Sequence, residues 1–282
     1  MPNTQELRRK IKSIRSTAKL TKAMQMVAAA KMARATERAV ASRRYANELS
    51  SVIAQLSGNS ALEHPLLRTP KQGRAAFIVV TSNRGLAGAL NSQVIRLAVS
   101  NLNDTTDLIV VGRKGQAYFR RFHPDRVVAE FPAADSLPAF QDATAIAHLV
   151  TTGFLEGRYS NVTVIYPQFE SLLRQVPTIK VVLPMSPDQT QDTITGTDYT
   201  FEPSAPKVLD TLLARSVPLR IFQMLVEASA SEHSSRMLAM KSATDNANDI
   251  VDELTLTYQG VRQANITRQI IEIASGAAAL SA

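Results

Sequence analysis

The sequence contains no cysteine among its 282 residues, which excludes disulfide bonds, thiolate chemistry and cysteine-based zinc sites. It also lacks an apolar run close to about 18 residues, the length that a transmembrane helix requires. Residues 1–10 show neither a hydrophobic region nor a small-residue cleavage site, so we expect no signal or transit peptide. These absences predict a soluble or peripheral protein and fit a reducing compartment.

Motifs that carry chemistry are scarce. The four histidines are scattered, without the spacing that places two metal ligands on one helix face. The stretch Gly85–Gly88 resembles a phosphate-binding loop, but it lacks the GxGxxG and GK[ST] patterns, so we interpret it as a tight turn. The GxSxG nucleophile motif is absent. We therefore expect no catalytic, cofactor-binding or metal-binding residues, and a protein that is not an enzyme by itself.

Proline is absent from Leu219 to Leu280, sixty-two residues in a row. Apolar and small residues recur there at every third or fourth position, which is a helical period. One helix of this length extends roughly 90 Å and needs a partner along most of it, as in a coiled coil. We expect this helix to begin after Pro218 and to follow a separate short helix at 205–216. Its expected seam is Leu219, Phe222, Val226, Ala230, His233, Met237, Met240, Thr244, Ala247, Val251, Leu254, Tyr258 and Val261.

Residues 3–57 carry a second helical stripe, with alanine dominant in its middle. Small residues at the seam let two helix backbones approach closely, and Gly58 supplies a stop signal. This helix is the natural partner of the C-terminal one, in an antiparallel or staggered pair. Its expected seam is Leu7, Ile11, Ile14, Ala18, Thr21, Gln25, Ala28, Met32, Ala35, Ala39, Ser42, Ala46, Leu49, Ile53 and Leu56.

Positive charge is concentrated in the first helix. The chain has a formal net charge of +8, and residues 1–45 alone hold twelve lysines and arginines against Glu6 and Glu37. Such one-sided charge predicts an acidic partner, the alternative being a solvated polar face. Nucleic acid is one candidate partner. However, the first aromatic residue is Tyr45, so the basic stretch offers no ring on which bases could stack.

The middle of the chain changes period. Continuous apolar runs at 75–80, 107–112, 127–131 and 162–166 alternate with helical patterns that end near Leu102, Phe122 and Glu156. This alternation predicts βαβ units and a parallel sheet. Two extended runs, 170–185 and 193–201, are expected to form an antiparallel edge or an irregular foot.

The last turns of the C-terminal helix differ from the rest. After Val261 the apolar phase slips to Ile266, Ile270 and Ile273, and alanines fill the other faces. A helix that is apolar all round is typical of burial inside something larger. We expect a slender tip enclosed by a collar of other subunits, with a frayed alanine-rich tail as the alternative.

Six strings stand out, in order, over both helices and the middle: IKSIRSTAKLTKAMQMVAAAKM at 11–32, SNRGLAGALN at 82–91, SEHSSRM at 231–237, AMKSATDNA at 239–247, RQANIT at 262–267 and EIASGAAA at 272–279. Together they resemble the gamma subunit of F-type ATP synthases. The family implies a Rossmann-like α/β domain at 70–204, between a coiled-coil helix at 1–58 and a helical segment at 205–282. Ala87 departs from many members, which carry cysteine there, and no cysteine-bearing insert is present.

The resemblance implies a rotor shaft inside a ring of three alpha and three beta subunits of a proton-translocating ATP synthase. The shaft couples rotation of the c-ring to conformational changes at the catalytic beta subunits. By motif position, Lys22, Met24 and Arg236 would lie near the carboxylate-rich loop of beta. Arg262 and Gln263 match the pair that hydrogen-bonds the catch loop of one beta subunit.

The family also implies a foot beside the epsilon subunit and the c-ring, where Tyr199, Phe201 and Glu202 would dock. The complex would then sit peripherally on the cytoplasmic face of a bacterial plasma membrane, with no cofactor in this chain and no nucleic acid as partner. Two alternatives stay open from the residues alone. One is a coiled-coil nucleic-acid-binding protein, and the other is a nucleotide-dependent α/β enzyme built on residues 75–200.

Overall fold

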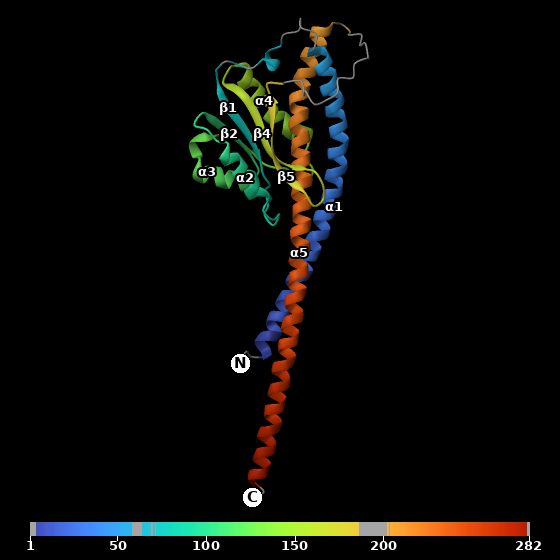
Figure 1. Ribbon diagram of the computed structural model, residues 1–282, viewed down its shortest axis with the longest axis vertical. Coiled ribbons are helices and arrows are strands. Elements are labelled where there is room, and N and C mark those ends of the chain that lie inside the picture. Colours follow the sequence, from blue (N-terminus) through green and yellow to red (C-terminus); the bar gives the residue numbers. More distant parts are fainter. Residues whose placement is uncertain are drawn as a thin grey trace. The chain divides into compact units, whose positions relative to one another are not determined.

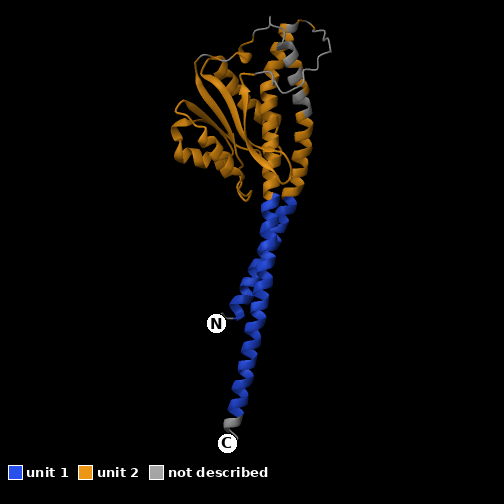
Figure 2. Ribbon diagram, viewed as in Figure 1, with its two compact units in different colours: residues 1–27, 237–282 blue, residues 28–236 orange. Residues whose placement is uncertain are grey.

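The computed structural model describes residues 4–57, 64–68, 70, 72–185, 202 and 204–280. The chain forms two compact units (Figure 2). Residues 1–27 and 237–282 make the helix-pair unit, and residues 28–236 make the α/β unit. Two long helices, α1 (Thr4–Ser57) and α5 (Ala205–Leu280), contribute residues to both units. The predicted class, an α/β fold combined with a long coiled coil, is confirmed.

In the helix-pair unit, the first turns of α1 lie beside α5 in antiparallel orientation (Figure 1). Arg8 Nη2 donates a hydrogen bond to Tyr258 Oη at 2.8 Å, and the hydroxyls of Thr21 and Thr244 are 2.7 Å apart. Residue numbers therefore rise along one helix while they fall along the other. The buried positions belong to the two predicted seams: Leu7, Ile11, Ala18, Met240, Thr244, Ala247 and Val251.

The α/β unit is built on a five-stranded sheet in the order β3-β2-β1-β4-β5. The first four strands are parallel, as predicted, because a helix lies in each of the three connections between them. β5 pairs with β4 in antiparallel orientation and forms the predicted edge. The second extended run, 193–201, lies outside the described residues. The strands are β1 (Arg74–Val80), β2 (Thr106–Val111), β3 (Val127–Phe131), β4 (Tyr159–Phe169) and β5 (Gln175–Leu183).

Helices cover both faces of this sheet. Alternate residues of β1 and β2 point to opposite faces, so Val79 and Val110 pack with α2 (Leu90–Ser100) and α3 (Arg113–Phe122). Ile78 and Ile109 face the other way. They join a larger core with α4 (Phe140–Leu155) and with segments of α1 and α5. Two short 3-10 helices, Pro65–Leu67 and Pro124–Arg126, complete the elements.

The break predicted at Pro218 is wrong, because α5 runs without interruption from Ala205 to Leu280 and contains this proline. Proline removes one backbone donor inside a helix and costs about 3 kcal/mol there. Packing offsets that cost on both sides, since Leu213, Val217 and Ile221 are at most 1% exposed. The separate short helix at 205–216 is therefore the first part of α5.

Candidate functional site

Two loops at the carboxyl ends of the strands are held by the long helices. Arg236 of α5 donates from its Nη2 to the backbone carbonyls of Arg84 at 3.3 Å and Gly85 at 3.2 Å. These carbonyls belong to the loop after β1, the predicted tight turn. Lys31 of α1 donates to the backbone carbonyl of Asp135, in the loop after β3, at 2.8 Å. We call these contacts the loop clamp.

The two loops are also bonded to each other. Asn83 Nδ2 donates to the carbonyl of Ala133 at 2.7 Å and to Asp135 Oδ1 at 3.0 Å. The hydrogen bond from the Asn83 side-chain amide is the main reason that the pKa of Asp135 lies below its ordinary value, because it favours the charged carboxylate. The clamp therefore joins α1, α5 and the ends of β1 and β3 into one hydrogen-bonded group.

A buried ionic group on α5 supports the clamp. Arg236, only 9% exposed, pairs with Glu232 at 2.7 Å and lies 3.3 Å from His233 Nδ1. Burial raises the pKa of Glu232, although the charge of Arg236 opposes that shift. Burial also lowers the pKa of His233 to about 4, and the positive charges of Arg236 and Lys31 lower it further. His233 is thus neutral in the folded protein at pH 7.

Because the pKa of His233 is lower in the folded chain than in the unfolded chain, its protonation favours unfolding. The contribution to the free energy of unfolding is full above about pH 6.5 and is lost as the pH falls toward 4. Between pH 7.5 and pH 5, we expect a loss of about 2 kcal/mol from this residue. Urea unfolding at both pH values measures it, with His233→Gln as the variant that lacks the titrating group.

The raised pKa of Glu232 acts in the opposite sense, because the folded state binds that proton more readily. Glu232 titrates in both the native chain and the His233→Gln variant. The difference between their losses of stability therefore isolates the contribution of His233. Equal losses of stability in the two proteins would contradict the assignment.

A second buried charge joins α1, α5 and β4 in the α/β unit. Glu227 is 1% exposed and accepts hydrogen bonds from Arg43 at 2.7 Å and from Tyr166 Oη at 3.1 Å. Burial raises the pKa of the Tyr166 phenol, and the neighbouring carboxylate raises it further. Glu227 was not predicted from the sequence. The signal that could have found it is its position within the apolar run Leu225-Val226 and Ala228.

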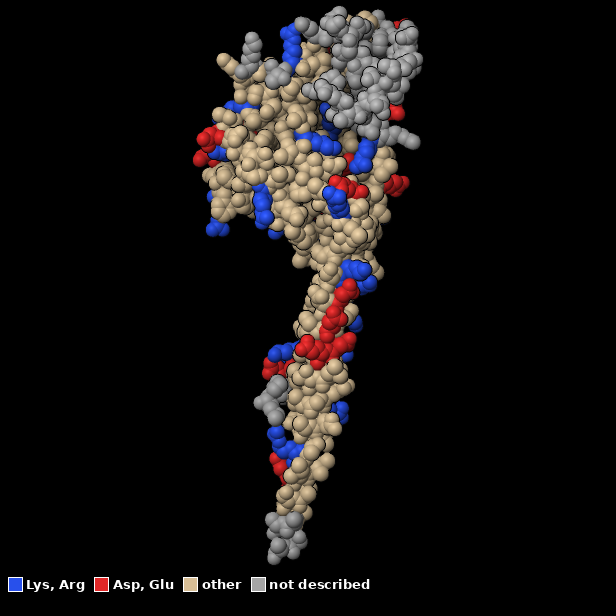
Figure 3. All heavy atoms as spheres, in the orientation of Figure 1, with Lys and Arg blue, Asp and Glu red and all other residues tan. Residues whose placement is uncertain are grey.

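The basic residues near the start of α1 face outward. Arg9, Lys12, Arg15 and Lys19 are exposed, and Lys10 pairs with Glu6 at 2.7 Å. Across the pair, α5 exposes acidic residues, and Figure 3 shows red and blue surfaces together on this part of the helix-pair unit. The exposed acidic residues are Asp245, Asp249, Asp252 and Glu253.

Pairing between the helices ends where the apolar phase slips. The guanidinium carbon of Arg8, near the start of α1, lies 5.7 Å from the centre of the Tyr258 ring. Beyond Val261, α5 exposes large apolar side chains, including Ile270 at 61% and Ile273 at 73%. Figure 3 shows mostly uncharged surface in this region. We call residues 262–277 the apolar tip.

The predicted contact residues fall into separate groups. Lys22 is exposed and Met24 is half-buried on α1 of the helix-pair unit, whereas Arg236 belongs to the α/β unit. Arg262 and Gln263 are exposed at the start of the apolar tip.

Of the predicted foot residues, Tyr199 and Phe201 lie outside the described residues, and Glu202 is exposed.

Within the part of the chain that the structure describes, no group of three or more histidine, aspartate or glutamate side chains is arranged to hold a metal ion. No helix among these residues is both long and apolar enough to cross a membrane. The long helices, the loop clamp and the apolar tip are therefore the features on which a functional interpretation can be built.

Comparison with known proteins gives concordant results. A family model described as ATP synthase matches residues 3–280. A protein named ATP synthase gamma chain, from Roseiflexus sp. (strain RS-1), is 44% identical over 100% of this chain and 99% of its own length. A chain from the central stalk and c-ring of the Tetrahymena thermophila mitochondrial ATP synthase is 27% identical. It has a TM-score of 0.59 and covers 79% of this chain and 99% of that one.

A chain in a structure of the Euglena gracilis mitochondrial ATP synthase shares the fold, with a TM-score of 0.71 at 18% identity. The match covers 98% of this chain and 94% of that chain.

Proposed function

The chain belongs to the ATP synthase gamma chain family, and from this premise we propose that its apolar tip turns inside a ring of three alpha and three beta subunits. The protein is the central rotor shaft of the complex and a non-catalytic subunit. It is peripheral to the membrane through the complex. Its relatives carry the gamma chain name along the full length, which favours this function over a nucleic-acid-binding coiled coil.

The observation that carries the proposal is the change in α5 at Val261. Before it, α5 has a partner helix and a buried seam, and beyond it large apolar residues are exposed. Exposed apolar surface of this kind marks a surface that another molecule covers. A collar of alpha and beta subunits satisfies this requirement, and the exposed cations of α1 suit the carboxylate-rich loop of beta.

We infer that the shaft acts through differential contacts. Each beta subunit meets a different side of an asymmetric rotor, so rotation shifts the open, loose and tight populations of the three catalytic sites in turn. The rotor itself makes and breaks no covalent bond. We attribute the stiffness of the rotor to the paired helices and, within the α/β unit, to the Arg43–Glu227 ion pair and the hydrogen bonds of the loop clamp.

The contacts to beta are proposed at Lys22, Met24, Arg262 and Gln263, of which all but the half-buried Met24 are exposed. For Arg236 we propose an indirect part in the same region. Its guanidinium donates to Glu232 and to the loop after β1, so it positions that loop for the contact.

The segment 199–202 is proposed as the foot. Tyr199, Phe201 and Glu202 would dock on the c-ring beside the epsilon subunit, on the cytoplasmic side of the plasma membrane. In this proposal the functional division follows residues 1–58, 70–204 and 205–282. Rotation of the c-ring enters at the foot and reaches the catalytic subunits through the long helices.

Co-expression with alpha and beta subunits tests the function. We expect the chain to co-purify with both and to support ATP hydrolysis by the complex, while the purified chain alone hydrolyses no ATP. Hydrolysis that survives purification of the isolated chain to homogeneity would overturn the rotor assignment. So would a complex of alpha and beta that excludes the chain.

The tip contacts are tested by replacing Arg262 and Gln263 with alanine in the complex. Each side chain is proposed to donate a hydrogen bond worth about 1 kcal/mol, so the double variant loses about 2 kcal/mol and ATP hydrolysis should fall roughly 30-fold. Gln269→Ala is the matched control, because Gln269 is exposed on the same tip and is not a proposed contact. Equal effects of the two changes would count against a specific contact at Arg262 and Gln263.

A further inference from the structure

Leu86, in the loop after β1, combines two features that a folded chain usually avoids. Its φ is +61°, and it is the only residue other than glycine with positive φ in the part of the chain that the structure describes. A leucine in this left-handed conformation is strained, because its Cβ comes too close to the following carbonyl oxygen. The residue is also 60% exposed, so packing within the α/β unit does not offset the strain.

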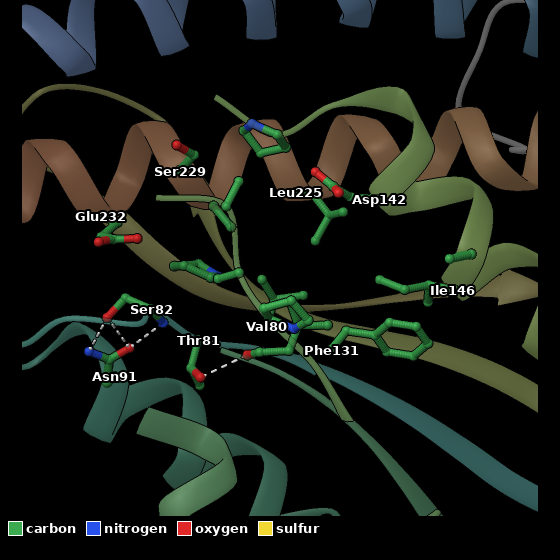
Figure 4. A pocket seen from close by; sticks show the side chains of 18 of the residues that line it. Val80, Thr81, Ser82, Asn91, Phe131, Asp142, Ile146, Leu225, Ser229 and Glu232 are labelled. Atoms are coloured by element: carbon green, nitrogen blue, oxygen red, sulfur yellow. Dashed lines mark hydrogen bonds between the residues drawn. The ribbon is translucent and has the colours of Figure 1, made fainter. Parts of the chain in front are cut away.

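Hydrogen bonds fix the backbone before Leu86. The carbonyl of Arg84 accepts from Ser82 Oγ at 2.6 Å, in addition to the bond from Arg236 in the loop clamp. Ser82 is held in turn by Asn91 of α2, whose Nδ2 donates to Ser82 Oγ at 2.8 Å, as Figure 4 shows. The loop is therefore tied to both α2 and α5 on this side.

The chain turns inward directly after Leu86. Ala87 is 2% exposed, and its carbonyl accepts from Leu90 N, at the start of α2, at 3.3 Å. Strain that the surrounding structure maintains at one residue is typical of functional sites. Single exposed leucines are common on protein surfaces, so the maintained strain is the observation that marks Leu86 as a contact residue.

Positive charge surrounds this loop. Three of the cations there are exposed: Arg84, Arg113 and Lys114. A Cβ placed on Gly85 would lie 3.6 Å from Cε of Lys114, so the lysine side chain lies against the loop. Apart from the hydrogen bond that Asp135 accepts from the neighbouring amide, its pKa is lowered by the charges of Arg84 and Arg113. Both guanidinium groups therefore lie near this carboxylate, and positive charge remains in excess.

We call Leu86 and these three cations the loop patch. Its chemistry fits an acidic protein segment with an apolar pocket, because carboxylates would face the cations while the pocket would bury the leucine. Nucleic acid offers phosphates but no pocket of this kind. The proposed function already includes an acidic segment, the carboxylate-rich loop of beta.

From this arrangement we propose that Leu86 is a contact residue of the shaft, buried in an apolar pocket of the carboxylate-rich loop of beta and flanked by ion pairs from the loop patch. The inference rests on the proposed function and adds two points to it. The contact is apolar at its centre, and the strain at Leu86 is maintained because it holds the side chain where beta meets it. The loop clamp supports this side chain.

Competition for assembly tests the contact. Native and variant chains are mixed with limiting alpha and beta subunits, and the share of each chain in the complex purified through beta gives their relative affinity. Leu86→Asn removes the apolar side chain, while asparagine tolerates the left-handed conformation. We expect this variant to be incorporated about ten-fold less well than the native chain, because the burial of a leucine side chain is lost.

Two variants serve as controls. Leu86→Met keeps an apolar side chain of similar volume and should be incorporated within about two-fold of the native chain. Leu155→Asn makes the same change at a leucine of similar exposure, 55%, at the end of α4. Because Leu155 lies outside the loop patch, this variant should be incorporated as well as the native chain.

Urea unfolding distinguishes a contact from a structural role. Leu86→Gly removes the Cβ that causes the strain, and this gain at least balances the greater freedom of the unfolded chain. We therefore expect its unfolding midpoint to lie at or above that of the native chain, although it competes as poorly as Leu86→Asn. A residue that served only the fold would lose stability and incorporation together.

Salt tests the charged part of the loop patch. Arg84→Gln combined with Lys114→Gln should lower incorporation at low ionic strength, and the difference from the native chain should shrink as salt rises. Leu86→Asn should show the same loss at both salt concentrations, because burial of an apolar side chain is not screened.

The outcomes separate this inference from the function on which it rests. If the native chain enters the complex and Leu86→Asn competes equally with it, the contact at Leu86 is wrong while the rotor function stands. Equal losses in Leu86→Asn and Leu155→Asn, or a salt dependence that the glutamine variant leaves unchanged, would also overturn the inference. Exclusion of the native chain from the complex would overturn both.

Discussion

Gly112→Ala is expected to lower the free energy of unfolding by more than about 3 kcal/mol and to prevent recovery of the chain in the ATP synthase complex. Gly112 follows β2 with φ +92°, a conformation that residues with a Cβ rarely adopt. A Cβ at this position would lie 2.1 Å from the backbone oxygen of Thr81. Thr81 cannot withdraw, because its N donates to the carbonyl of Val111 at 2.9 Å.

The position of Gly112 explains why its replacement should affect assembly as well as stability. Gly112 N donates to the carbonyl of Phe131 at 2.9 Å, and the next turn begins with Lys114 N donating to Ser82 O at 3.1 Å. Both bonds help to hold the loops of the clamp. We therefore expect loss of stability and loss of assembly to occur together, measured by urea unfolding of the chain and by co-purification with alpha and beta.

Gly88 and Gly157 offer matched controls. Both have positive φ, +56° and +74°, but an added Cβ meets nothing within 4 Å at either position. Alanine there should cost only about 1 kcal/mol, from backbone conformation alone. If Gly112→Ala were no worse than these two changes, the close approach to Thr81 would not be the cause.

Arg43→Met is expected to lower the free energy of unfolding by about 3 kcal/mol, the second large effect. The variant leaves the Glu227 carboxylate buried without its cation, and Glu227 is only 1% exposed. Tyr166 and Gln223 still donate to it, but they are neutral. Since this pair joins α1 to α5 within the α/β unit, we also expect weaker coupling between ATP hydrolysis and ion transport in the complex.

Two further variants separate charge from packing. Arg34→Met is the matched control, because Arg34 is an exposed arginine on the same helix, and it should change stability by less than about 0.5 kcal/mol. Adding Glu227→Gln to Arg43→Met removes the uncompensated charge while keeping an acceptor for Tyr166. The double variant should regain at least half of the lost stability, and a further loss would show that the charge is not responsible.

The elements of the fold were largely predictable because their sequence periods are long and regular. The α1 seam from Leu7 to Ile53 and the α5 seam to Val251 are buried or half-buried wherever the structure describes their side chains. The continuous apolar runs became the parallel strands, since strands covered on both faces need apolar residues throughout. The prediction at Pro218 failed because a local rule was overridden by packing of its neighbours on the sheet.

The candidate site was predictable only in part. The slip in phase after Val261 is visible in the residue pattern and indicated a tip without a partner helix, and the strings that resemble the gamma family supplied the names of the proposed contact residues. Glu227 was not predicted, because it is one polar residue in a helix whose neighbours suggest only a buried face. Its importance depends on the side chains of Arg43 from α1 and Tyr166 from β4 that lie opposite it.

By itself, the sequence determined the two long helices, their seams, the parallel strands and the family, because these depend on periodicity and on strings of neighbouring residues. Only the tertiary structure decided the loop clamp and the buried Arg43–Glu227 pair. Those features join residues that are 151 positions apart, as in Arg236 and Gly85, or 184 positions apart, as in Arg43 and Glu227. Hydrogen bonds and burial at such separations depend on how the elements pack in three dimensions, and no local pattern in the chain encodes them.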